Sequence, residues 1–517
     1  MLAKLVRNLF GAGAVDGTHA APGDAAGGAQ SGSADELLRR AAEAATGGRL
    51  TTALELYRQC MLAHPRSLDA CLGAAGVLVD LWSNDEAVAA YETARELAPA
   101  SGRVFSALLF HRHYLSPVDA ARLFELHRAY GTLMHTALPQ APAVHAQNAE
   151  PERRLRIGYV SPNLSRHSVG YFIEPVLRAH DRDRFEVFCY YNHALADDAT
   201  ARMREAAHGW REIADANDDT VARMVRDDRI DILVDLAGHS KGNRLGAFAR
   251  RPAPVQMTWL GYPDTTGLAA VDYRITDDQA DPAPAAASRH TEMLLRIDDC
   301  FLCYAPPSDA PAVQPRGAGA ALTFSSFNNL AKLNAETLEL WGRILAGAPG
   351  SRLMLKSPAL NFPDTVDRLL DSLDRAGIEA ARVELRGWIG DRRHHLELYN
   401  EIDIALDTFP YNGTTTTCEA LWMGVPVITR AGEVHMSRVG ASLLHCAGLD
   451  QFVAHDAAAY VRLAGELARD AAARAALRAE LRTRLRASPL LDHAGFTQKL
   501  EAQYRRAWRQ SCGARRA

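Results

Sequence analysis

From about residue 150 onward, short apolar segments alternate with amphipathic ones, and this alternation constrains the fold more than any other feature. Polar turn residues follow each apolar segment. The segments cover residues 156–161, 185–191 and 230–236 in a first block, and 322–327 and 352–356 in a second. Buried strands that alternate with helices predict parallel sheets covered by helices. We therefore predict two α/β domains, at 150–318 and 319–485, followed by a C-terminal helix and tail at 486–517.

A helical pattern precedes these blocks. Three residue types recur at a spacing of 34 positions: Ala53, Tyr57 and Pro65 are repeated as Ala87, Tyr91 and Pro99. This is the period of tetratricopeptide repeats, in which alanine allows close helix crossing and tyrosine fills the seam between helices. We predict all-α repeats over 35–137, with 103–136 as a divergent third pair or a cap. Two helical hairpins with a chance spacing are the alternative. Residues 1–34, rich in Gly, Ala and Ser, are predicted to be a disordered leader.

The composition excludes several classes of protein. The chain has 62 acidic and 58 basic residues, a net charge of −4, and both signs are interspersed. Neither nucleic acid nor a membrane is implied as a partner, and no segment reaches the roughly 18 apolar residues of a membrane span. The eight cysteines lie mostly in apolar segments, which predicts a reducing, cytoplasmic location. Cys300 and Cys303 have no second pair at metal-ligand spacing, so we interpret them as buried structural residues.

Four consecutive threonines directly before an apolar, helix-like segment are the most informative motif, within residues 407–424. A helix start offers free backbone N–H groups and a positive dipole end to an anion such as phosphate. The hydroxyls of Thr414, Thr415 and Thr416 add donors, and Glu419, one turn on, could accept the hydroxyls of a ribose. The pattern predicts a diphosphate-binding turn. An ordinary capped helix rich in threonine is the alternative.

Other polar residues of the second block follow predicted strands, where ligands of parallel sheets bind. Asn329 and Lys332 follow the first strand of this block, and the charge of Lys332 could offset that of a leaving diphosphate. Arg392 and His395 lie in a later loop between a strand and a helix, where His395 could stack on a base or hydrogen-bond near it. An ordinary surface lysine is the alternative for Lys332.

In the first block, His167 follows the first strand and is a candidate acid, base or orienting group. It could also merely cap the next helix. Asp235 and His239 follow the third strand at the same edge of the sheet and are further catalytic candidates. No Asp-x-Asp metal motif occurs in the right context, so we expect no metal cofactor.

These motifs together resemble glycosyltransferase family 41, which comprises protein O-GlcNAc transferases and SPINDLY-like proteins. The resemblance covers nearly the whole chain after the leader. It rests on five segments in order: 158–167, 251–263, 272–277, 327–332 and 407–424. It implies a GT-B fold, in which two Rossmann-like domains hold the donor between them, preceded here by an all-α tetratricopeptide segment.

The resemblance also implies roles for single residues. His167 matches the family's active-site histidine and Lys332 its diphosphate-binding lysine, and His395 matches a nucleotide contact. Several donor contacts differ from the animal enzymes, which have glutamine, histidine and aspartate where this chain has Asn329, Thr414 and Glu419. Asn329, the four threonines and the Cys-Phe-Leu-Cys-Tyr304 segment look closer to the SPINDLY-like branch, whose plant member transfers fucose from GDP-fucose.

The implied reaction is an inverting transfer of GlcNAc from the nucleotide sugar UDP-GlcNAc to Ser or Thr of protein acceptors, which the helical repeats would bind. No covalent enzyme intermediate is expected, and no metal is needed if Lys332 and the threonine turn neutralise the leaving diphosphate. Protein O-fucosylation from GDP-fucose is the close alternative. A repeat scaffold whose transferase domains have lost activity is an alternative of another class.

Overall fold

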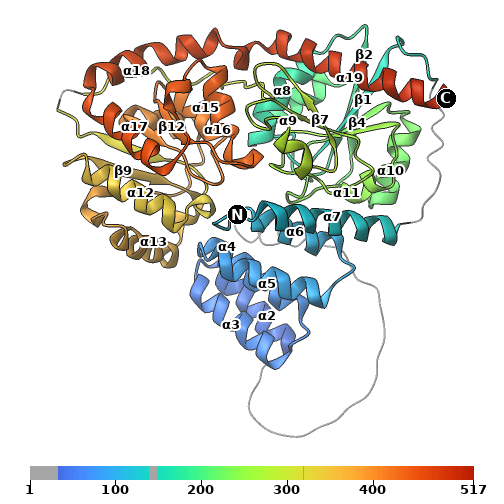
Figure 1. The fold of residues 1–517 in the computed structure, drawn as a ribbon. Coiled ribbons are helices and arrows are strands. Elements are labelled where there is room, and N and C mark those ends of the chain that lie inside the picture. Colours follow the sequence, from blue (N-terminus) through green and yellow to red (C-terminus); the bar gives the residue numbers. More distant parts are fainter. Residues whose placement is uncertain (1–32, 139–147, 318, 517) are drawn as a thin grey trace, which may run out of the picture.

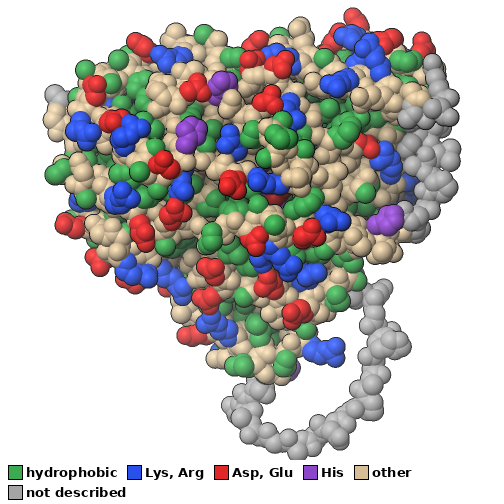
Figure 2. All heavy atoms as spheres, viewed as in Figure 1, with side chains coloured by type: hydrophobic (Ala, Val, Ile, Leu, Met, Phe, Trp, Pro, Cys, Tyr) green, Lys and Arg blue, Asp and Glu red, His purple; other side chains and the backbone are tan. Residues whose placement is uncertain are grey.

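The computed structural model describes residues 33–138, 148–317 and 319–516, so nearly all of the predicted leader lies outside the described residues. Repeat helices come first, two α/β domains follow, and a long helix ends the chain (Figure 1). On the face shown in Figure 2, acidic and basic side chains are mixed over all parts of the surface. None of the described helices has the length and apolar character that crossing a membrane requires.

The N-terminal segment forms antiparallel helix pairs. Its helices are α2 (Ala34–Thr46), α3 (Leu50–Ala63), α4 (Leu68–Asp80), α5 (Asn84–Leu97), α6 (Gly102–Arg112) and α7 (Ala120–Ala137). The Tyr57 ring lies so close to Gly73 that a Cβ added there would be 2.4 Å from it. Side chains of Ser67 and Ser101 accept hydrogen bonds from the first turns of α4 and α6, which fixes where these helices begin.

The first α/β domain contains a seven-stranded parallel sheet in the order β3-β2-β1-β4-β5-β6-β7. Its strands are β1 (Leu155–Ser161), β2 (Phe185–Tyr191), β3 (Gly209–Glu212), β4 (Ile232–Asp235), β5 (Val255–Thr258), β6 (Tyr273–Thr276) and β7 (Met293–Arg296). The helices α8 (Ser168–Ala179), α9 (Asp198–Ala206), α10 (Asp218–Asp227) and α11 (Leu245–Ala249) connect them. The strands predicted at 156–161, 185–191 and 230–236 correspond to β1, β2 and β4.

The second α/β domain has a six-stranded parallel sheet in the order β10-β9-β8-β11-β12-β13. Its strands are β8 (Thr323–Ser326), β9 (Arg352–Lys356), β10 (Val383–Arg386), β11 (Ile404–Leu406), β12 (Val427–Arg430) and β13 (Val453–Ala454). Its α-helices are α12 (Ala335–Ala346), α13 (Pro363–Arg375), α14 (Arg392–Glu397), α15 (Thr415–Trp422), α16 (Val439–Cys446), α17 (Ala457–Arg469) and α18 (Ala471–Arg486). The predicted pair of parallel-sheet domains after an all-α segment is confirmed.

The last helix, α19 (His493–Arg516), returns from the second domain and packs on α8 of the first (Figure 1). The Tyr504 hydroxyl lies 3.1 Å from that of Tyr159, and Glu501 Oε1 lies 2.8 Å from Nδ1 of His180. All four side chains are buried. The C-terminal helix is therefore part of the first domain's core.

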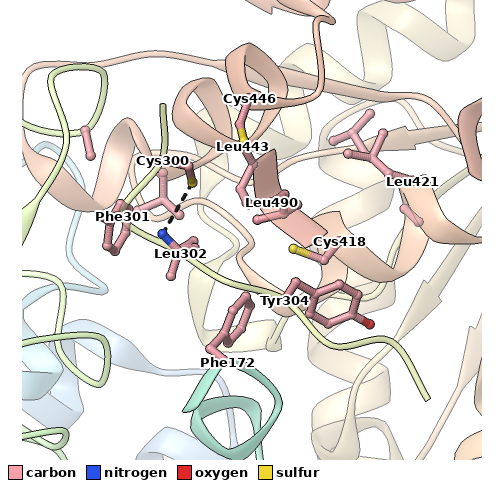
Figure 3. Close-up of a cluster of buried hydrophobic side chains, with 14 of the residues drawn as sticks. Phe172, Cys300, Phe301, Leu302, Tyr304, Cys418, Leu421, Leu443, Cys446 and Leu490 are labelled. Carbon is pink, nitrogen blue, oxygen red and sulfur yellow. Dashed lines mark hydrogen bonds between the residues drawn. The ribbon is translucent and has the colours of Figure 1, made fainter. Parts of the chain in front are cut away.

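The Cys-Phe-Leu-Cys segment lies in a buried apolar cluster, together with side chains of α8, α15 and α16 (Figure 3). The Leu302 N–H donates to Sγ of Cys300 at 3.4 Å, and this sulfur is 3.5 Å from the Ser442 hydroxyl. All eight cysteines of the chain are buried. The interpretation of Cys300 and Cys303 as buried structural residues is confirmed.

The repeat helices contact both α/β domains. In the turn between α4 and α5, Nε1 of Trp82 donates to the Leu333 carbonyl at 2.9 Å, and at the first residue of α5, Nδ2 of Asn84 donates to the Ala331 carbonyl at 2.8 Å. On the other side, the Ser106 hydroxyl of α6 is 2.8 Å from Nδ1 of His239 in the first domain. The repeats thus connect the two domains in addition to the chain that joins them.

Candidate active site

The predicted donor residues gather at the carboxyl edge of the second sheet, where β8 and β11 end and α14 and α15 begin. The first domain reaches the same place through α8. There the Arg392 guanidinium lies over the Tyr171 ring, with Cζ 3.5 Å from the ring centroid. The site is therefore built at the contact between the two domains.

A buried carboxylate, Asp407, shapes the turn that follows β11. Its Oδ1 accepts hydrogen bonds from the N–H groups of Gly413 and Thr408 at 2.7 and 2.9 Å, and its Oδ2 accepts from the Thr429 hydroxyl at 2.7 Å. Burial raises the pKa of Asp407 to about 6, although the Gly413 N–H favours the charged form. Sequence reasoning did not single out Asp407, although it is the first residue of the threonine motif.

The four threonines do lie at a helix start, as predicted. Thr414 precedes α15, and its side chain makes no capping hydrogen bond. The first N–H groups of the helix therefore have no acceptor from the cap residue's side chain. The Thr416 hydroxyl donates to Oδ1 of Asn328 at 2.7 Å, and Asn328 in turn donates to Asp407. The Thr415 hydroxyl is buried and has no partner among the described residues. The turn is thus held from behind and leaves donors for a ligand.

Lys332 lies beside this turn. Its Nζ donates to the Asn412 carbonyl at 2.7 Å and is 4.0 Å from the centroid of the Tyr411 ring. Burial lowers the pKa of Lys332 to about 8, and the charge of Asp407 opposes this shift. Asn329 is exposed, and its side chain accepts from the Ala331 N–H at 3.0 Å, which fixes the short 3-10 turn Leu330–Lys332.

Glu419 and His395 form a pair at the inner end of the site. Nε2 of His395 is 3.0 Å from Oε2 of Glu419, whereas its Nδ1 is buried without a partner among the described residues. The imidazole also lies near the Phe327 ring, with 5.8 Å between centroids. The nearby Arg392 has two buried guanidinium nitrogens, Nε and Nη2, that lack acceptors in the described part of the chain. These groups are free to bind polar atoms of a ligand.

Among the candidates of the first domain, His167 is exposed. Its Nδ1 accepts a hydrogen bond from the Val169 N–H at 3.2 Å, so His167 caps α8. The surrounding protein removes enough water from the imidazole to lower the pKa of His167 to about 4. Since the imidazole is neutral at pH 7, it can accept a proton or orient a hydroxyl.

Asp235 and His239 lie in a different environment, fully enclosed by protein. The Asp235 carboxylate accepts from Ala237 N–H, Gly238 N–H and the Thr258 hydroxyl, and burial raises its pKa to about 6. His239 has one ring nitrogen 2.8 Å from the Ser106 hydroxyl and the other 2.9 Å from the Thr266 carbonyl. Both side chains support the loop after β4 and its contact with α6. The structure leaves His167 as the candidate open to a substrate.

Polar atoms without partners are concentrated at this site. Buried polar groups are normally hydrogen-bonded, so each exception requires an explanation. Six of the eighteen buried side-chain atoms without a partner in the described chain lie here: the hydroxyl oxygens of Tyr304, Ser326 and Thr415, two nitrogens of Arg392 and Nδ1 of His395. Their concentration makes the contact between the two domains the candidate position for a polar ligand.

Known proteins resemble this chain over most of its described length. Residues 114–304 and 314–500 match the family model Glycosyl transferase family 41. A protein of Petunia hybrida named probable UDP-N-acetylglucosamine–peptide N-acetylglucosaminyltransferase SPINDLY is 43% identical over 78% of this chain and 44% of its own length. The corresponding Arabidopsis thaliana protein named SEC is 29% identical over 77% of this chain and 42% of its own length. The chain thus spans less than half the length of these relatives.

A solved bacterial structure matches more completely. An O-GlcNAc transferase mutant of Thermobaculum terrenum superposes with a TM-score of 0.87 at 38% identity, covering 93% of this chain and 92% of that one. The predicted GT-B architecture with a helical N-terminal segment is thereby confirmed. By the extent of these matches, the chain is a member of glycosyl transferase family 41.

Proposed function

We propose that this protein transfers N-acetylglucosamine from UDP-GlcNAc to Ser or Thr hydroxyls of proteins, with inversion at the anomeric carbon. The observation that carries the proposal is the set of buried polar atoms without partners around the start of α15, because donors at a helix start favour an anionic ligand such as a nucleoside diphosphate. Support for the transferred sugar comes from the relatives, whose names describe N-acetylglucosaminyl transfer to peptides.

The proposed roles follow from the contacts. The N–H groups at the start of α15, the Thr415 hydroxyl and the Lys332 ammonium bind the diphosphate. Glu419, positioned by His395, accepts the ribose hydroxyls. The acceptor oxygen forms a bond to the anomeric carbon while the bond to the diphosphate oxygen breaks, and His167 receives or orients the hydroxyl proton.

Metal independence is part of the proposal. Lys332 supplies a positive charge beside the threonine turn, and the start of α15 adds its dipole. We expect turnover to be unchanged after exhaustive EDTA treatment. A loss of activity that Mg²⁺ or Mn²⁺ restores would contradict this part.

Protein O-fucosylation from GDP-fucose is the second candidate. The chain is 40–43% identical to the plant SPINDLY proteins but 29% identical to SEC. Asn329, Thr414 and Glu419 are the donor-side positions at which the sequence departs from the animal O-GlcNAc transferases. Because the chain is more similar to the SPINDLY proteins, GDP-fucose is retained as the second candidate donor.

Thermal shift with UDP, GDP, UDP-GlcNAc and GDP-fucose tests the proposal, because a ligand that binds only the folded protein raises its Tm. Transfer to a Ser- and Thr-containing peptide, measured by intact mass, then identifies the sugar. Stabilisation by UDP and its sugar is expected. Stabilisation by GDP alone would select the fucosyl alternative, and stabilisation by neither would favour an inactive scaffold. Acceptor binding by the repeat helices and a cytoplasmic location, which the small number of cysteines and their burial support, complete the proposal.

A further inference from the structure

Two histidines and an aspartate meet where the last two repeat helices contact the first α/β domain. His113 caps the end of α6, His127 lies in α7, and Asp264 lies in the loop between β5 and β6. α7 runs along the first domain beside α11 (Figure 1). One possible ligand atom of each residue lies within 4.8 Å of those of the other two. The function proposed above gives these three side chains no role.

Both imidazoles are oriented by the backbone one helical turn earlier. Nδ1 of His113 lies 2.8 Å from the Leu109 carbonyl oxygen, and Nδ1 of His127 lies 2.7 Å from that of Leu123. A carbonyl oxygen only accepts hydrogen bonds, so each Nδ1 carries the proton and each Nε2 of a neutral ring has a lone pair. Metal-binding histidines have this arrangement, because their second nitrogen donates to an outer oxygen.

The carboxylate of Asp264 faces one of these lone pairs. Its Oδ2 is 3.1 Å from Nε2 of His113, and its Oδ1 accepts from the Thr265 N–H at 2.7 Å. An ionised carboxylate and the unprotonated nitrogen of an imidazole are both acceptors, so either a second proton or a cation must lie between them. A proton would join only this pair, whereas a metal ion would also bind Nε2 of His127.

The backbone around the three side chains is closely packed. A Cβ added at Gly267 would lie 2.0 Å from the His127 carbonyl oxygen, and one added at Gly131 of α7 would lie 1.8 Å from the Gly267 carbonyl oxygen. The buried guanidinium of Arg274 donates to the Asp264 carbonyl at 2.6 Å. The helix and the loop are therefore fixed against each other, and a metal would find its ligands already in place.

The donor atoms indicate which metal the site would bind. Two imidazoles and one carboxylate are ligands of zinc and, where open positions remain, of non-haem iron. This site is nearly closed, since both histidines are buried and the Asp264 side chain is 21% exposed. The Tyr262 hydroxyl, 2.8 Å from Nε2 of His127, is a further oxygen beside the same nitrogen. A closed site with four ligands is typical of structural zinc.

We propose that His113, His127 and Asp264 bind a structural Zn²⁺ ion, with the Tyr262 hydroxyl as the fourth ligand, and that this ion fastens the repeat helices to the first α/β domain. The ion takes no part in sugar transfer. The inference is therefore independent of the proposed function, and it is compatible with turnover that needs no metal.

Elemental analysis of the full-length protein tests the site. The protein is purified without a histidine tag, incubated with Zn²⁺ and dialysed against metal-free buffer. We expect about one zinc per chain, and at least about tenfold less in Asp264→Asn and His127→Gln, which each remove one ligand. Asp264→Asn retains the shape of the side chain and offers an N–H to His113. Asp450→Asn, at the exposed pair of His445 and Asp450, is the matched control and should retain the zinc.

Thermal unfolding with and without the chelator dipicolinate tests the structural role. A metal that binds only the folded protein raises its Tm, so the chelator should lower the Tm of the unaltered protein by several degrees and leave that of Asp264→Asn unchanged. Turnover well below the Tm should not change. A zinc-loaded protein whose Tm does not respond to removal of the metal would overturn the structural role.

The remaining outcomes also decide the matter. An unaltered protein without zinc would show that a proton joins His113 and Asp264, and zinc that persists in both ligand variants would be bound elsewhere; either result overturns the site. Iron in place of zinc overturns the assigned metal. If the variants do not fold, Co²⁺ loaded into the unaltered protein replaces them as the test. The visible absorption of tetrahedral Co²⁺ is then expected, and its absence overturns the proposal.

Discussion

At the scale of single residues, the proposed function gives the largest electrostatic role to Lys332, whose Nζ lies beside the threonine turn and feels the charge of Asp407. Replacing Lys332 by Met removes a charge that would stabilise the leaving diphosphate. We expect kcat/KM to fall about 10²- to 10³-fold, the range for loss of one electrostatic contact in a transition state. Donor turnover on a peptide measures it. Lys499→Met, at an exposed ion pair, is the control, and a folded Lys332→Met protein with near-normal turnover would contradict the assignment.

The lowered pKa of Lys332 predicts a pH dependence. As the pH rises through about 8, the ammonium loses its proton and its attraction for the diphosphate, so kcat/KM should decline on the alkaline side. His167, with a pKa near 4, stays neutral over this range and adds no step. In Lys332→Arg the side chain stays charged, and the alkaline decline should disappear. A decline of the same shape in both proteins would assign it to another group.

The free hydroxyl of Thr415 gives a third prediction at this scale. Thr415→Val keeps the shape of the side chain and removes a donor that has no partner in the described protein. We expect weaker donor binding, by about 0.5–1.5 kcal/mol, with an unchanged Tm in the absence of nucleotide. Thr417→Val, which breaks a bond to the Gly413 carbonyl, should instead lower the Tm of the free protein.

Many residues of the candidate site could be predicted from the sequence, and there are physical reasons why the others could not. Lys332, Glu419, His395 and the threonines follow strands of one sheet, so their proximity follows from the rule that ligands bind at carboxyl ends. Lys356, the last residue of β9, has its Nζ 5.9 and 5.8 Å from the ring centroids of Phe327 and Trp388, and this proximity depends on which strands are neighbours. The order β10-β9-β8-β11 cannot be read from a pattern of single strands.

At the scale of elements, the turn between α4 and α5 supports the segment that carries Lys332. Trp82 and Asn84 donate to the carbonyls of Leu333 and Ala331, on either side of that lysine. The double variant Trp82→Phe, Asn84→Ala removes both hydrogen bonds, each worth about 0.5–1.5 kcal/mol. We expect it to lower kcat/KM for the nucleotide sugar about tenfold. Arg58→Ala, at an exposed ion pair of the repeats, is the control. Equal kcat/KM in both variants would show that the turn does not position Lys332.

Elements with long apolar patterns were predicted well, whereas the short strands were not. β2 and β9 have the predicted bounds, and β1 begins one residue before its predicted range. β13 has only two residues, and β10 is partly exposed along its length. The residue patterns of β10 and β13 do not differ from those of loops. These strands form because neighbouring strands offer hydrogen-bond partners to their backbones.

At the scale of the whole molecule, α19 ties the end of the chain to the first domain. Oε1 of Glu501 lies 2.8 Å from Nδ1 of buried His180 and accepts from the Asp181 N–H. Glu501→Ala leaves these groups without an acceptor and should cost about 2–3 kcal/mol. Urea unfolding followed by tryptophan fluorescence measures the shift. Glu152→Ala, at the exposed pair with Arg509, should shift the midpoint far less; equal shifts would contradict the structural role of Glu501.

The repeats are fastened to the first domain through α6 and to the second through the turn before α5. Separating the two α/β domains would therefore require the repeat helices to bend, or their hydrogen bonds to one of the domains to break. In the proposed function, spent nucleotide and fresh donor would therefore have to exchange without separation of the two α/β domains.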